Sequence, residues 1–424
     1  MITGRKRIQR IKRIQRKTLK RKKKGKSYRR RRGGSAIDAG TYGCVFNPSI
    51  KCANKKKVDP NTISKLMYDK KTKLELIEVE KIKKIIKDIP DNEKYFLLSN
   101  IYDCKPDKLT SEDLINFDEK CKLFTKRDIN SMNVNNNLDK LSLIVMPNGG
   151  ISVNKFFKKI IQLPAKEINK NFVICNNSLI KLLVNGILPM NAKKFNHYDV
   201  KSGNILIGED GNTRLIDWGL ADSNDGFNIP DAIQNHAIVF NLPISCILFN
   251  SFVKKILPQE LHKFKSPNQT SGQGELLKIV AATLINESLL QINKGHYDYI
   301  TKLILPSIYK RFALKNYNYL IDYNSTSTTV LIEYIQAVLL AYVDKNGNFN
   351  DTKYFYEVFV KNADICGFLT TYLPIIEYGA DKFHPEIINS ICRILLKYCF
   401  STEFATKAID VDEVVQELKL LNMI

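Results

Sequence analysis

The sequence predicts an α+β fold with two lobes, a small strand-rich lobe followed by a large and mostly helical one. Three observations indicate this. Short apolar runs of strand length gather between residues 35 and 147. From residue 153 onward, apolar residues mostly recur at helical spacing. A single hairpin-like segment, residues 196–222, lies within the helical part, and 424 residues are enough for a substantial core.

The small lobe begins with "AIDAGTYGCVF" (residues 36–46), a pattern typical of a strand, a glycine turn and a second strand. "TISKLMY" (62–68) predicts a third strand that holds one Lys. "KLELIEVEKIKKIIKDI" (73–89) has apolar residues at helical spacing and predicts a helix that ends before Pro90. "YFLLSNIY" (95–102) and "LSLIVM" (141–146) predict further strands. Between them lies an Asp-, Lys- and Asn-rich insert, about residues 106–140, of mixed helix and loop.

The large lobe follows the connector "PNGG" (147–150). "VNKFFKKIIQL" and "NNSLIKLLVNGIL" predict helices before the hairpin, and the chain is mostly helical from residue 237 to the end. The predicted organisation is therefore a basic disordered tail (1–34), a small lobe (35–147) and a large lobe (148–424) whose C-terminal part is divergent and helical.

The net charge of +23 is concentrated at the start of the chain. Residues 1–32 contain 18 of the 66 Lys and Arg residues and no Asp or Glu, so the other 392 residues carry a net charge of only +5. Like-charge repulsion predicts that this tail is disordered by itself. Such a tail either binds nucleic acid or another polyanion, or is a solubilising arm without a specific partner.

The cysteines and the apolar segments indicate the cellular compartment of the protein and whether it spans a membrane. The nine cysteines form no C-x-x-C pair, and the start of the chain is too charged for a secretory signal peptide. We therefore expect reduced, mostly buried thiols, no zinc site, and an intracellular protein of the cytoplasm or nucleus. The best membrane candidate, residues 237–253, is short and interrupted by Asn and Pro, which favours a buried core helix over a membrane span.

The segment "NHYDVKSGNILIGEDGNTRLIDWGLAD" (196–222) contains a set of groups suited to phosphoryl transfer. "NILI" and "TRLID" are predicted strands joined by an Asp-Gly turn. Such a hairpin brings its ends together, so that Asn204 and Asp217 share divalent cations through oxygen ligands. Asp199 would lie beside them as a proton acceptor, and Lys201 would meet the transferred group. The alternative is a structural hairpin with solvated carboxylates.

These residues resemble a known catalytic motif. "HYDVKSGN" is similar to the H-R-D-x-K-x-x-N catalytic loop of eukaryotic-type protein kinases, and "DWG" is similar to their D-F-G. The resemblance covers residues 36–249 and implies a two-lobed protein-kinase-like fold that uses ATP and Mg²⁺. It implies transfer of the γ-phosphate of ATP to Ser or Thr hydroxyls of a protein substrate. Asp199 and Lys201 would then be catalytic, and Asn204 and Asp217 would be the metal ligands.

Upstream motifs of the same family follow in the same order. "IDAGTYGCV" (37–45) resembles the glycine-rich loop over the phosphates, although Asp38 replaces the first glycine. Lys65 matches the Lys that holds the α- and β-phosphates, a role counted as catalytic as well as nucleotide-binding. The residues that the resemblance assigns to the nucleotide are Ile37, Asp38, Ala39, Gly40, Thr41, Tyr42, Gly43, Cys44, Val45, Lys65, Glu78 and Met146.

Two of these assignments have alternatives. Glu75, Glu78 and Glu80 all compete as the acidic partner of Lys65, and Glu78 is preferred because isoleucines follow it four and seven residues later. "IVMPNGG" resembles the hinge that receives the adenine, with Met146 or Val145 at the gatekeeper position. The Asn-, Lys- and Ile-rich composition also resembles the divergent kinases of large DNA viruses, which implies packaging in the virion if the chain is viral.

The departures from the family concern regulation and the acceptor. Tyr198 replaces the Arg that normally pairs with a phosphorylated activation loop, so activity without loop phosphorylation is expected. No A-P-E follows; its nearest counterpart is "IPD" (229–231), and Ser223 is then the only hydroxyl of the segment. "NLPISC" (241–246) stands where a D-x-W-S-x-G helix belongs, with Asn241 in place of the Asp that braces the catalytic loop.

Three functions are compatible with these features. A Ser/Thr protein kinase is favoured by Lys201, two residues after the Asp. A small-molecule phosphotransferase of the aminoglycoside or choline kinase type is the alternative, because such enzymes use H-x-D-x-x-x-x-N and often carry "I-D-W", which includes Trp218, the only Trp. The third is a pseudokinase scaffold held on nucleic acid by its tail.

Overall fold

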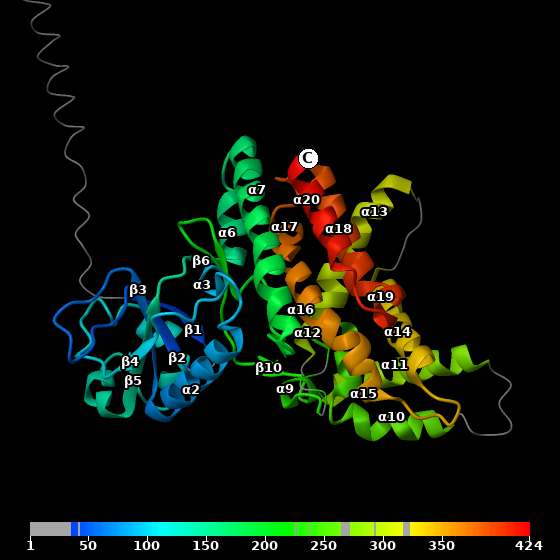
Figure 1. Ribbon diagram of the computed structural model, residues 1–424, viewed down its shortest axis with the longest axis horizontal. Coiled ribbons are helices and arrows are strands. Elements are labelled where there is room, and N and C mark those ends of the chain that lie inside the picture. The colour runs from blue at the N-terminus through cyan, green and yellow to red at the C-terminus, as the bar shows by residue number, and fades with distance from the viewer. Residues whose placement is uncertain are drawn as a thin grey trace, which may run out of the picture. The chain divides into compact units, whose positions relative to one another are not determined.

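The computed structural model describes residues 35–40, 43–224, 226, 228–236, 238–263, 272–291, 294–316 and 323–424. The predicted basic tail, and Thr41 and Tyr42 of the glycine turn, lie outside these residues. The chain is α+β and divides into two compact units (Figure 1). One comprises Met1–Leu74 and Ile101–Met146, and the other comprises Glu75–Asn100 and Pro147–Ile424.

The smaller unit contains a five-stranded sheet in the order β1-β2-β3-β5-β4. Its strands are β1 (Ser35–Gly40), β2 (Gly43–Asn47), β3 (Thr62–Tyr68), β4 (Tyr102–Cys104) and β5 (Leu141–Pro147). Pairs β1–β2, β2–β3 and β4–β5 are antiparallel. The strands predicted at residues 36–46, 62–68 and 141–146 are confirmed. The strand predicted at 95–102 is mostly wrong, because α3 (Asn92–Tyr95) and an irregular segment precede the short β4.

The insert is mixed helix and loop, as predicted, and it completes the core of the smaller unit. Its short helices are α4 (Phe117–Lys120), α5 (Lys122–Thr125), η1 (Val134–Asn136) and η2 (Leu138–Lys140). Phe117 and Phe124 are fully buried and join Phe46 of β2 in one hydrophobic cluster. The rings of Phe46 and Phe117 lie 6.3 Å apart, which ties the insert to the sheet.

Four cysteines of the smaller unit are paired, which corrects the expectation of reduced thiols throughout. Cys44 bonds to Cys121 of the insert, with Cα atoms 5.2 Å apart, and Cys52 bonds to Cys104, with Cα atoms 5.8 Å apart. The spacing along the chain concealed these pairs, because folding brings together cysteines separated by 77 and 52 residues. The other five cysteines (Cys175, Cys246, Cys366, Cys392 and Cys399) are free and buried.

Helix α2 (Asp69–Ile86) crosses from one unit to the other. The sequence places all of residues 35–147 in the small lobe, whereas residues 75–100 pack with the larger unit. The reason lies after the helix, where the backbone N–H of Leu97 donates to the carbonyl of Leu215 at 3.3 Å and Phe96 forms a bridge with the same residue.

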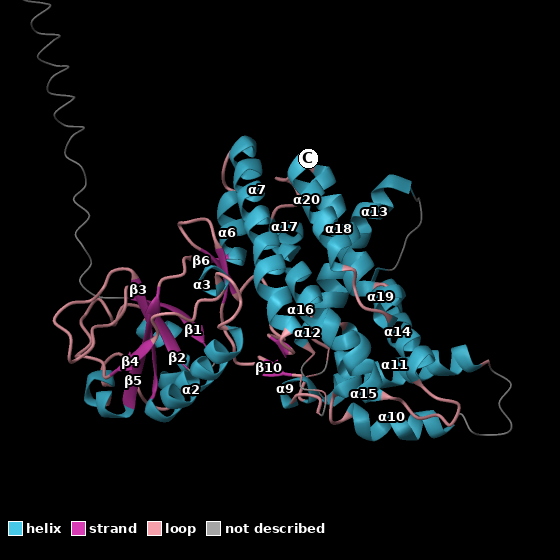
Figure 2. Ribbon diagram, in the orientation of Figure 1, coloured by secondary structure: helices cyan, strands magenta, loops and turns pink. Residues whose placement is uncertain are grey.

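The larger unit is mainly helical, with two small sheets (Figure 2). The strands are β6 (Ile151–Ser152), β7 (Phe195–Asn196), β8 (Ile205–Ile207), β9 (Thr213–Leu215) and β10 (Asp222–Ser223). The helices up to residue 262 are α6 (Val153–Ile160), α7 (Ala165–Leu182), the π-helix η3 (Leu183–Ile187), α8 (Leu188–Ala192), α9 (Asp231–Gln234), the 3₁₀ helix η4 (Ile244–Phe249) and α10 (Val253–His262).

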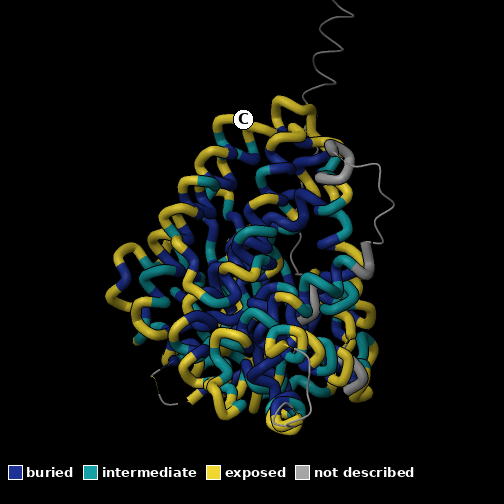
Figure 3. Tube along the Cα trace, turned by 90° about the vertical axis from the view of Figure 1, so that its right-hand side faces the viewer, coloured by how far each residue is buried: buried dark blue, intermediate teal, exposed yellow. Residues whose placement is uncertain are grey.

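The rest of the unit is helical. Its elements are α11 (Gln273–Gln291), α12 (Gly295–Tyr299), η6 (Ile300–Ile304), α13 (Leu305–Asn316), α14 (Tyr323–Tyr342), α15 (Asp351–Tyr354), η7 (Phe355–Phe359), α16 (Val360–Leu369), η8 (Thr370–Tyr372), α17 (Leu373–Tyr378), α18 (Pro385–Phe400), α19 (Thr402–Thr406), α20 (Val411–Leu420) and η9 (Leu421–Met423). Buried residues run through these helices (Figure 3), and nine of the ten residues of α16 are buried.

Two apolar segments bear on membrane binding. Residues 244–249, the centre of the segment considered from the sequence, form η4, and all six are buried. Among the described residues, one helical stretch, Ala165–Ala192, is long and apolar enough to cross a membrane, and half of its most apolar window is buried inside the protein. A core helix of a globular unit passes the same test.

Candidate active site

The hairpin predicted from residue 204 onward is present. β8 and β9 pair antiparallel, with Ile205 opposite Leu215 and Ile207 opposite Thr213. Gly211 adopts φ +74° in the connecting turn, a conformation that suits glycine. At the open end of the hairpin, the N–H of Ile216 donates to the carbonyl of Asn204 at 2.9 Å. The residues on either side of the two strands are thereby brought together, as the sequence predicts.

The carboxylate of Asp199 accepts hydrogen bonds from three side chains. Its carboxylate oxygens accept from Lys201 Nζ at 2.7 and 2.8 Å. Oδ2 also accepts from Asn204 Nδ2 at 2.8 Å, and Oδ1 accepts from Asn241 Nδ2 at 3.0 Å. The side chain is 15% exposed. A carboxylate has about four lone-pair sites, so these donors fill them and fix its orientation.

The main chain of this loop is hydrogen-bonded to the side chain of Asp364 in α16. Its carboxylate accepts the N–H groups of His197 and Tyr198, both at 2.9 Å. The side-chain amides of Asn191 and Asn196 donate to it as well, at 2.7 and 3.2 Å. Asp364 is 1% exposed, so its charge is balanced by donors rather than by water. The expectation that position 241 takes the place of the family's Asp is therefore wrong: Asp364 accepts the main-chain N–H groups before Asp199, whereas Asn241 donates to the carboxylate of Asp199 and to the carbonyl of Val200.

His197 connects the loop to the D-W-G residues. Its Nδ1 accepts the N–H of Asp199 at 3.2 Å, so Nε2 carries the proton and donates to the carbonyl of Ile216 at 3.1 Å. Burial lowers the pKa of His197, which keeps the ring neutral. The ring meets Trp218 edge-on with centroids 4.9 Å apart, and Trp218 also packs on Phe96 and Phe195 at 5.6 and 6.4 Å. Trp218 is thus part of the support for the loop.

Asn204 and Asp217 have ligand atoms suited to a hard cation. Asn204 uses its Nδ2 for Asp199, which leaves the amide oxygen as its acceptor. Asp217 is exposed, so its side chain is accessible. One carboxylate and one amide oxygen fit Mg²⁺ that is bound mainly through substrate phosphates. In the described part of the chain, no three His, Cys, Asp or Glu side chains gather in a metal-binding cluster.

No protein-family model and no curated protein matches this chain.

The remaining predicted nucleotide residues lie in the smaller unit. Ala39 and Gly40 of β1 pair antiparallel with Cys44 and Gly43 of β2, so the two strands predicted on either side of the glycine turn lie next to each other. The same unit contains Ile37, which is 41% exposed, and Asp38, which is opposite Val45.

Lys65 is half-buried on β3, directly opposite Val45. Gly43 is required by packing here, because a Cβ atom would lie 2.6 Å from the carbonyl oxygen of Leu66. Met146 is half-buried and Val145 is buried at the end of β5.

The three competing carboxylates of α2 differ in exposure. Thr72, Val79, Ile82 and Ile86 form the buried stripe of the helix. Glu75 is half-buried and lies in the register of that stripe, whereas Glu78 and Glu80 are exposed. Glu80 forms a surface ion pair with Lys83 at 2.6 Å. The helix therefore turns Glu75, rather than the preferred Glu78, toward its buried side.

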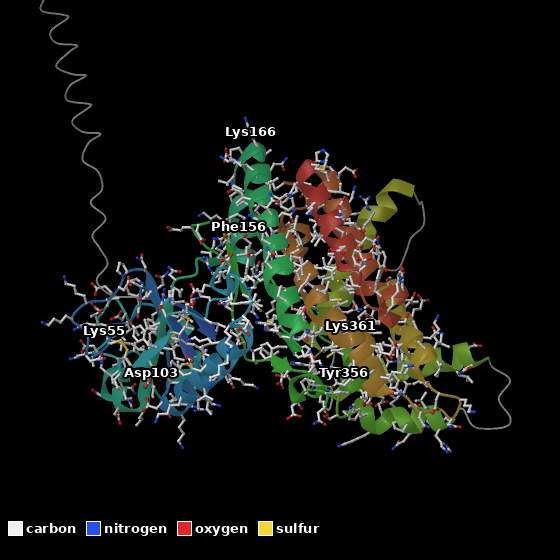
Figure 4. All side chains as sticks on the ribbon, in the orientation of Figure 1. Lys55, Asp103, Phe156, Lys166, Tyr356 and Lys361 are labelled. Carbon is white, nitrogen blue, oxygen red and sulfur yellow. A yellow bond between two sulfur atoms is a disulfide. The ribbon has the colours of Figure 1, made fainter. Side chains whose placement is uncertain are left out.

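The described residues after D-W-G are held by hydrogen bonds between uncharged groups. The N–H of Asn224 donates to the carbonyl of Lys194 at 2.8 Å, and β10 pairs with β7. Tyr356, labelled in Figure 4, donates its hydroxyl to the carbonyl of Asn228 at 3.0 Å. Tyr198 is 1% exposed and, in place of the Arg of the family motif, points an aromatic ring into the interior. These contacts hold residues 222–224 and 228 in place.

Sequence reasoning missed Asp364 and its neighbour Gly367. A Cβ atom on Gly367 would lie 2.6 Å from the carbonyl oxygen of Val200 and 3.0 Å from that of Asn241, so only glycine permits α16 to approach both. The available signal was "DICG" (364–367), an Asp and a Gly at helical spacing in an apolar segment. It was overlooked because it lies far downstream of the expected position.

Proposed function

We propose that the chain is an ATP-dependent protein kinase that transfers the γ-phosphate of ATP to Ser or Thr hydroxyls, with no need for activation-loop phosphorylation. The observation that carries this proposal is the carboxylate of Asp199, held by Lys201 and Asn204 within a loop whose main chain is bonded to Asp364. Phosphoryl transfer needs a positioned base and a cation beside it.

The proposed roles follow from the chemistry of each side chain. The acceptor hydroxyl attacks the γ-phosphorus, the bond to the β,γ-bridging oxygen breaks, and ADP leaves. Asp199 orients the hydroxyl and receives its proton. Lys201, which is 32% exposed and lies within 2.8 Å of both oxygens of Asp199, is close enough to bond a phosphoryl oxygen at the same place. Mg²⁺, held by Asn204 and Asp217, would neutralise charge on the phosphates.

The nucleotide-binding roles in the smaller unit rest on the resemblance of its motifs. Lys65 is the proposed partner of the α- and β-phosphates. The β1–β2 turn would cover the phosphates with backbone N–H groups. The segment "IVMPNGG" (144–150) would receive the adenine through its backbone, with Met146 or Val145 at the gatekeeper position.

The hydrogen bonds of residues 222–224 and 228, which involve no phosphate-binding cation, support activity without a phosphorylated loop. In the family pattern, an Arg before the catalytic Asp awaits a phosphate. Here Tyr198 is buried at that position, and Asn224 and Tyr356 secure the segment by hydrogen bonds. No charged group has to be added to order these residues.

A small-molecule phosphotransferase is the second candidate. The observation that favours it is Trp218 of "IDW", whose ring meets the His197 ring edge-on. Lys201 argues for the protein kinase, because its ion pair with Asp199 gives it a specific place beside the proposed acceptor position.

The test is phosphate transfer from labelled ATP and Mg²⁺ to three acceptors in parallel: a generic basic protein, a Ser/Thr peptide library, and a panel of small alcohols and aminoglycosides. We expect label on the protein and peptides and none on the small molecules. Asp199→Ala should abolish transfer and leave ATP affinity within about twofold, since Asp199 meets the acceptor rather than the nucleotide. Asp381→Asn, an exposed carboxylate change, is the control.

Each acceptor result decides between the candidates. Label on small molecules alone would replace the protein-kinase proposal by the second candidate. ATP binding without transfer to any acceptor would indicate the pseudokinase scaffold. Transfer that persists in Asp199→Ala would remove Asp199 from the mechanism.

A further inference from the structure

We infer that Asn241 is a positioning residue for Asp199 and that helix α12 keeps it in place through Phe240. The inference rests on the proposed function, because it concerns how the proposed base is held. The structural link itself, from α12 to the catalytic loop, can be tested apart from activity.

The contacts of Asn241 are those of a brace rather than of a surface residue. The residue is 1% exposed. Its Nδ2 donates to Asp199 Oδ1 at 3.0 Å and to the carbonyl of Val200 at 3.2 Å, so a single amide joins the carboxylate to the main chain of the loop. On the other side, the carbonyl of Asn241 lies against Gly367 of α16. Asn241 is therefore wedged between the loop and that helix.

This brace becomes important when Lys201 bonds to a phosphate. Of the donors to Asp199, Lys201 contacts both oxygens, whereas Asn241 contacts only Oδ1 and Asn204 contacts only Oδ2. Once Lys201 turns to a phosphoryl oxygen, the two amides still hold one oxygen each. They fix the plane of the carboxylate and leave acceptor positions on Asp199 open for a substrate hydroxyl. Asn204 is also a proposed metal ligand, so Asn241 is the brace with no other proposed task.

Phe240 carries the support outward from Asn241. Its ring stacks on His296, with centroids 5.5 Å apart and planes 15° apart. It meets Tyr299 edge-on at 5.1 Å and 80°. Both partners belong to α12, and the Tyr299 hydroxyl is hydrogen-bonded to Glu377 of α17. Aromatic pairs of this geometry are directional, so they define the position of Phe240 and of the residue that follows it.

The consequence is a site in which the packing of side chains from α12 orders the base, so that phosphorylation of the activation loop is not needed for this. The helices between η4 and α16 have no counterpart in the family motifs identified in the sequence. One of them, α12, supplies the aromatic partners for the residue next to the brace. We name this set, Phe240, Asn241, His296 and Tyr299, the α12 clamp. Because it consists of side chains already packed, the clamp orders the base in the unmodified protein.

The test uses the full chain with four variants: Asn241→Leu, which removes the donor at similar volume, Phe240→Ala, Phe240→Tyr, which keeps the ring, and the double variant Asn241→Leu with Phe240→Ala. We expect Asn241→Leu to lower kcat about 10- to 100-fold, the worth of one hydrogen bond to a charged group. KM for ATP should stay within about twofold, because Asn241 does not belong to the nucleotide site. Exposed Asn346→Leu is the matched control.

The role of Phe240 is tested by comparing the single variants with the double variant, which shows whether the effects of Phe240 and Asn241 on kcat are coupled. Phe240→Ala should lower kcat, Phe240→Tyr should restore most of it, and the double variant should be no slower than Asn241→Leu alone, since Phe240 acts through Asn241. Unchanged kcat in Asn241→Leu, or additive losses in the double variant, would overturn the inference. If the control Asn346→Leu lowered kcat and thermal stability as much as Asn241→Leu does, the loss would be a general structural effect. That result would overturn the inference as well.

Hydrogen exchange separates the inference from the proposed function. Phe240→Ala should speed exchange of the amides of residues 197–204 and leave those of α18 unchanged. If the wild-type protein transfers phosphate to no acceptor, the proposed function fails, and the clamp still stands or falls on this measurement. Unaltered exchange at residues 197–204 would overturn the clamp whether or not the protein is active.

Discussion

The carboxylate of Asp364 accepts the main-chain N–H of His197 at 2.9 Å across 167 residues of sequence. The same carboxylate accepts the N–H of Tyr198, so one buried charge fixes two successive peptide groups just before Asp199. Tyr198 adopts φ +56°, which turns these N–H groups toward one side of the loop. The shape of the loop therefore depends on a helix that the local sequence does not contain.

Asp364→Asn should weaken both the loop and the fold. The substitution removes a charge that accepts four donors and places an NH₂ group among them. We expect the free energy of unfolding to fall by about 3 kcal/mol, as for other buried charge networks that lose a partner. We expect kcat to fall about 100-fold, because small displacements at a catalytic group have this cost. Urea unfolding and initial rates measure the two effects.

Asp381→Asn, which changes an exposed carboxylate, is the control and should alter neither quantity. If Asp364→Asn left the exchange rates of the His197 and Tyr198 amides unchanged, the bracing role would be disproved.

The local parts of the site were predictable, and the long-range parts were not. The hairpin, Asp199, Lys201 and Asn204 lie within a few residues of one another, and turn chemistry with alternating strands determines their arrangement. Asp364 was not predictable in this way, because inserted helices separate it from the loop. The exposure of Glu78 was not predicted for another reason. The prediction used only the isoleucines of α2 to find its buried side, whereas Thr72 and Val79 are buried as well and turn that side away from Glu78.

The disulfides should account for a measurable part of the stability of the smaller unit. Replacing Cys52 and Cys104 together by Ala should lower the free energy of unfolding by about 2–5 kcal/mol. Cys104 is half-buried, whereas Cys44 and Cys121 are at most 1% exposed, so reductant should open Cys52–Cys104 first. Alkylation followed by peptide mass mapping identifies the order.

The wild-type protein and the double variant form a matched pair for this test. Mild reductant should lower the stability of the wild-type protein toward that of the variant and should change the variant little. Protein purified without reductant that alkylates at all nine cysteines after unfolding would contradict both pairs.

Ser223→Ala should leave the rate of phosphate transfer within about twofold of wild type. Ser223 of β10 is held by main-chain pairing with Phe195 of β7, which the substitution keeps, and the neighbouring contacts of Asn224 are neutral. Initial rates with dephosphorylated protein measure the effect. Ser223→Asp serves as the companion variant, since a rate gain there together with a loss in Ser223→Ala would establish control by phosphorylation.

Removing residues 1–32 should weaken binding to DNA or heparin and flatten its salt dependence. These residues carry 18 positive charges and no negative ones, so they release most of the counterions on binding. The slope of log Kobs against log salt should approach that of a near-neutral protein, while phosphate transfer to a peptide stays unchanged. A tail of equal length with Gln at the 18 positions separates charge from length, and an unaltered slope in that variant would exclude the tail as the binding element.

Stability should fall as the pH drops from about 6.5 toward 5, through three histidines of the larger unit. Burial lowers the pKa of His197, His236 and His296 below the ordinary value of 6.5. The carboxylates of Asp364, Asp199 and Asp217 around His197 act in the opposite direction and are outweighed by its burial.

The unfolded chain therefore binds protons first as the pH falls, so the stabilisation is complete above pH 6.5 and is lost toward the lower pKa of the folded state. Each histidine adds at most about 1.4 kcal/mol per pH unit to the slope. Urea unfolding at half-unit steps from pH 7.5 to 5 measures this slope. His296→Gln should reduce it, whereas His262→Gln, at an exposed position, should not. A slope that is identical in wild type and His296→Gln would remove His296 from the explanation.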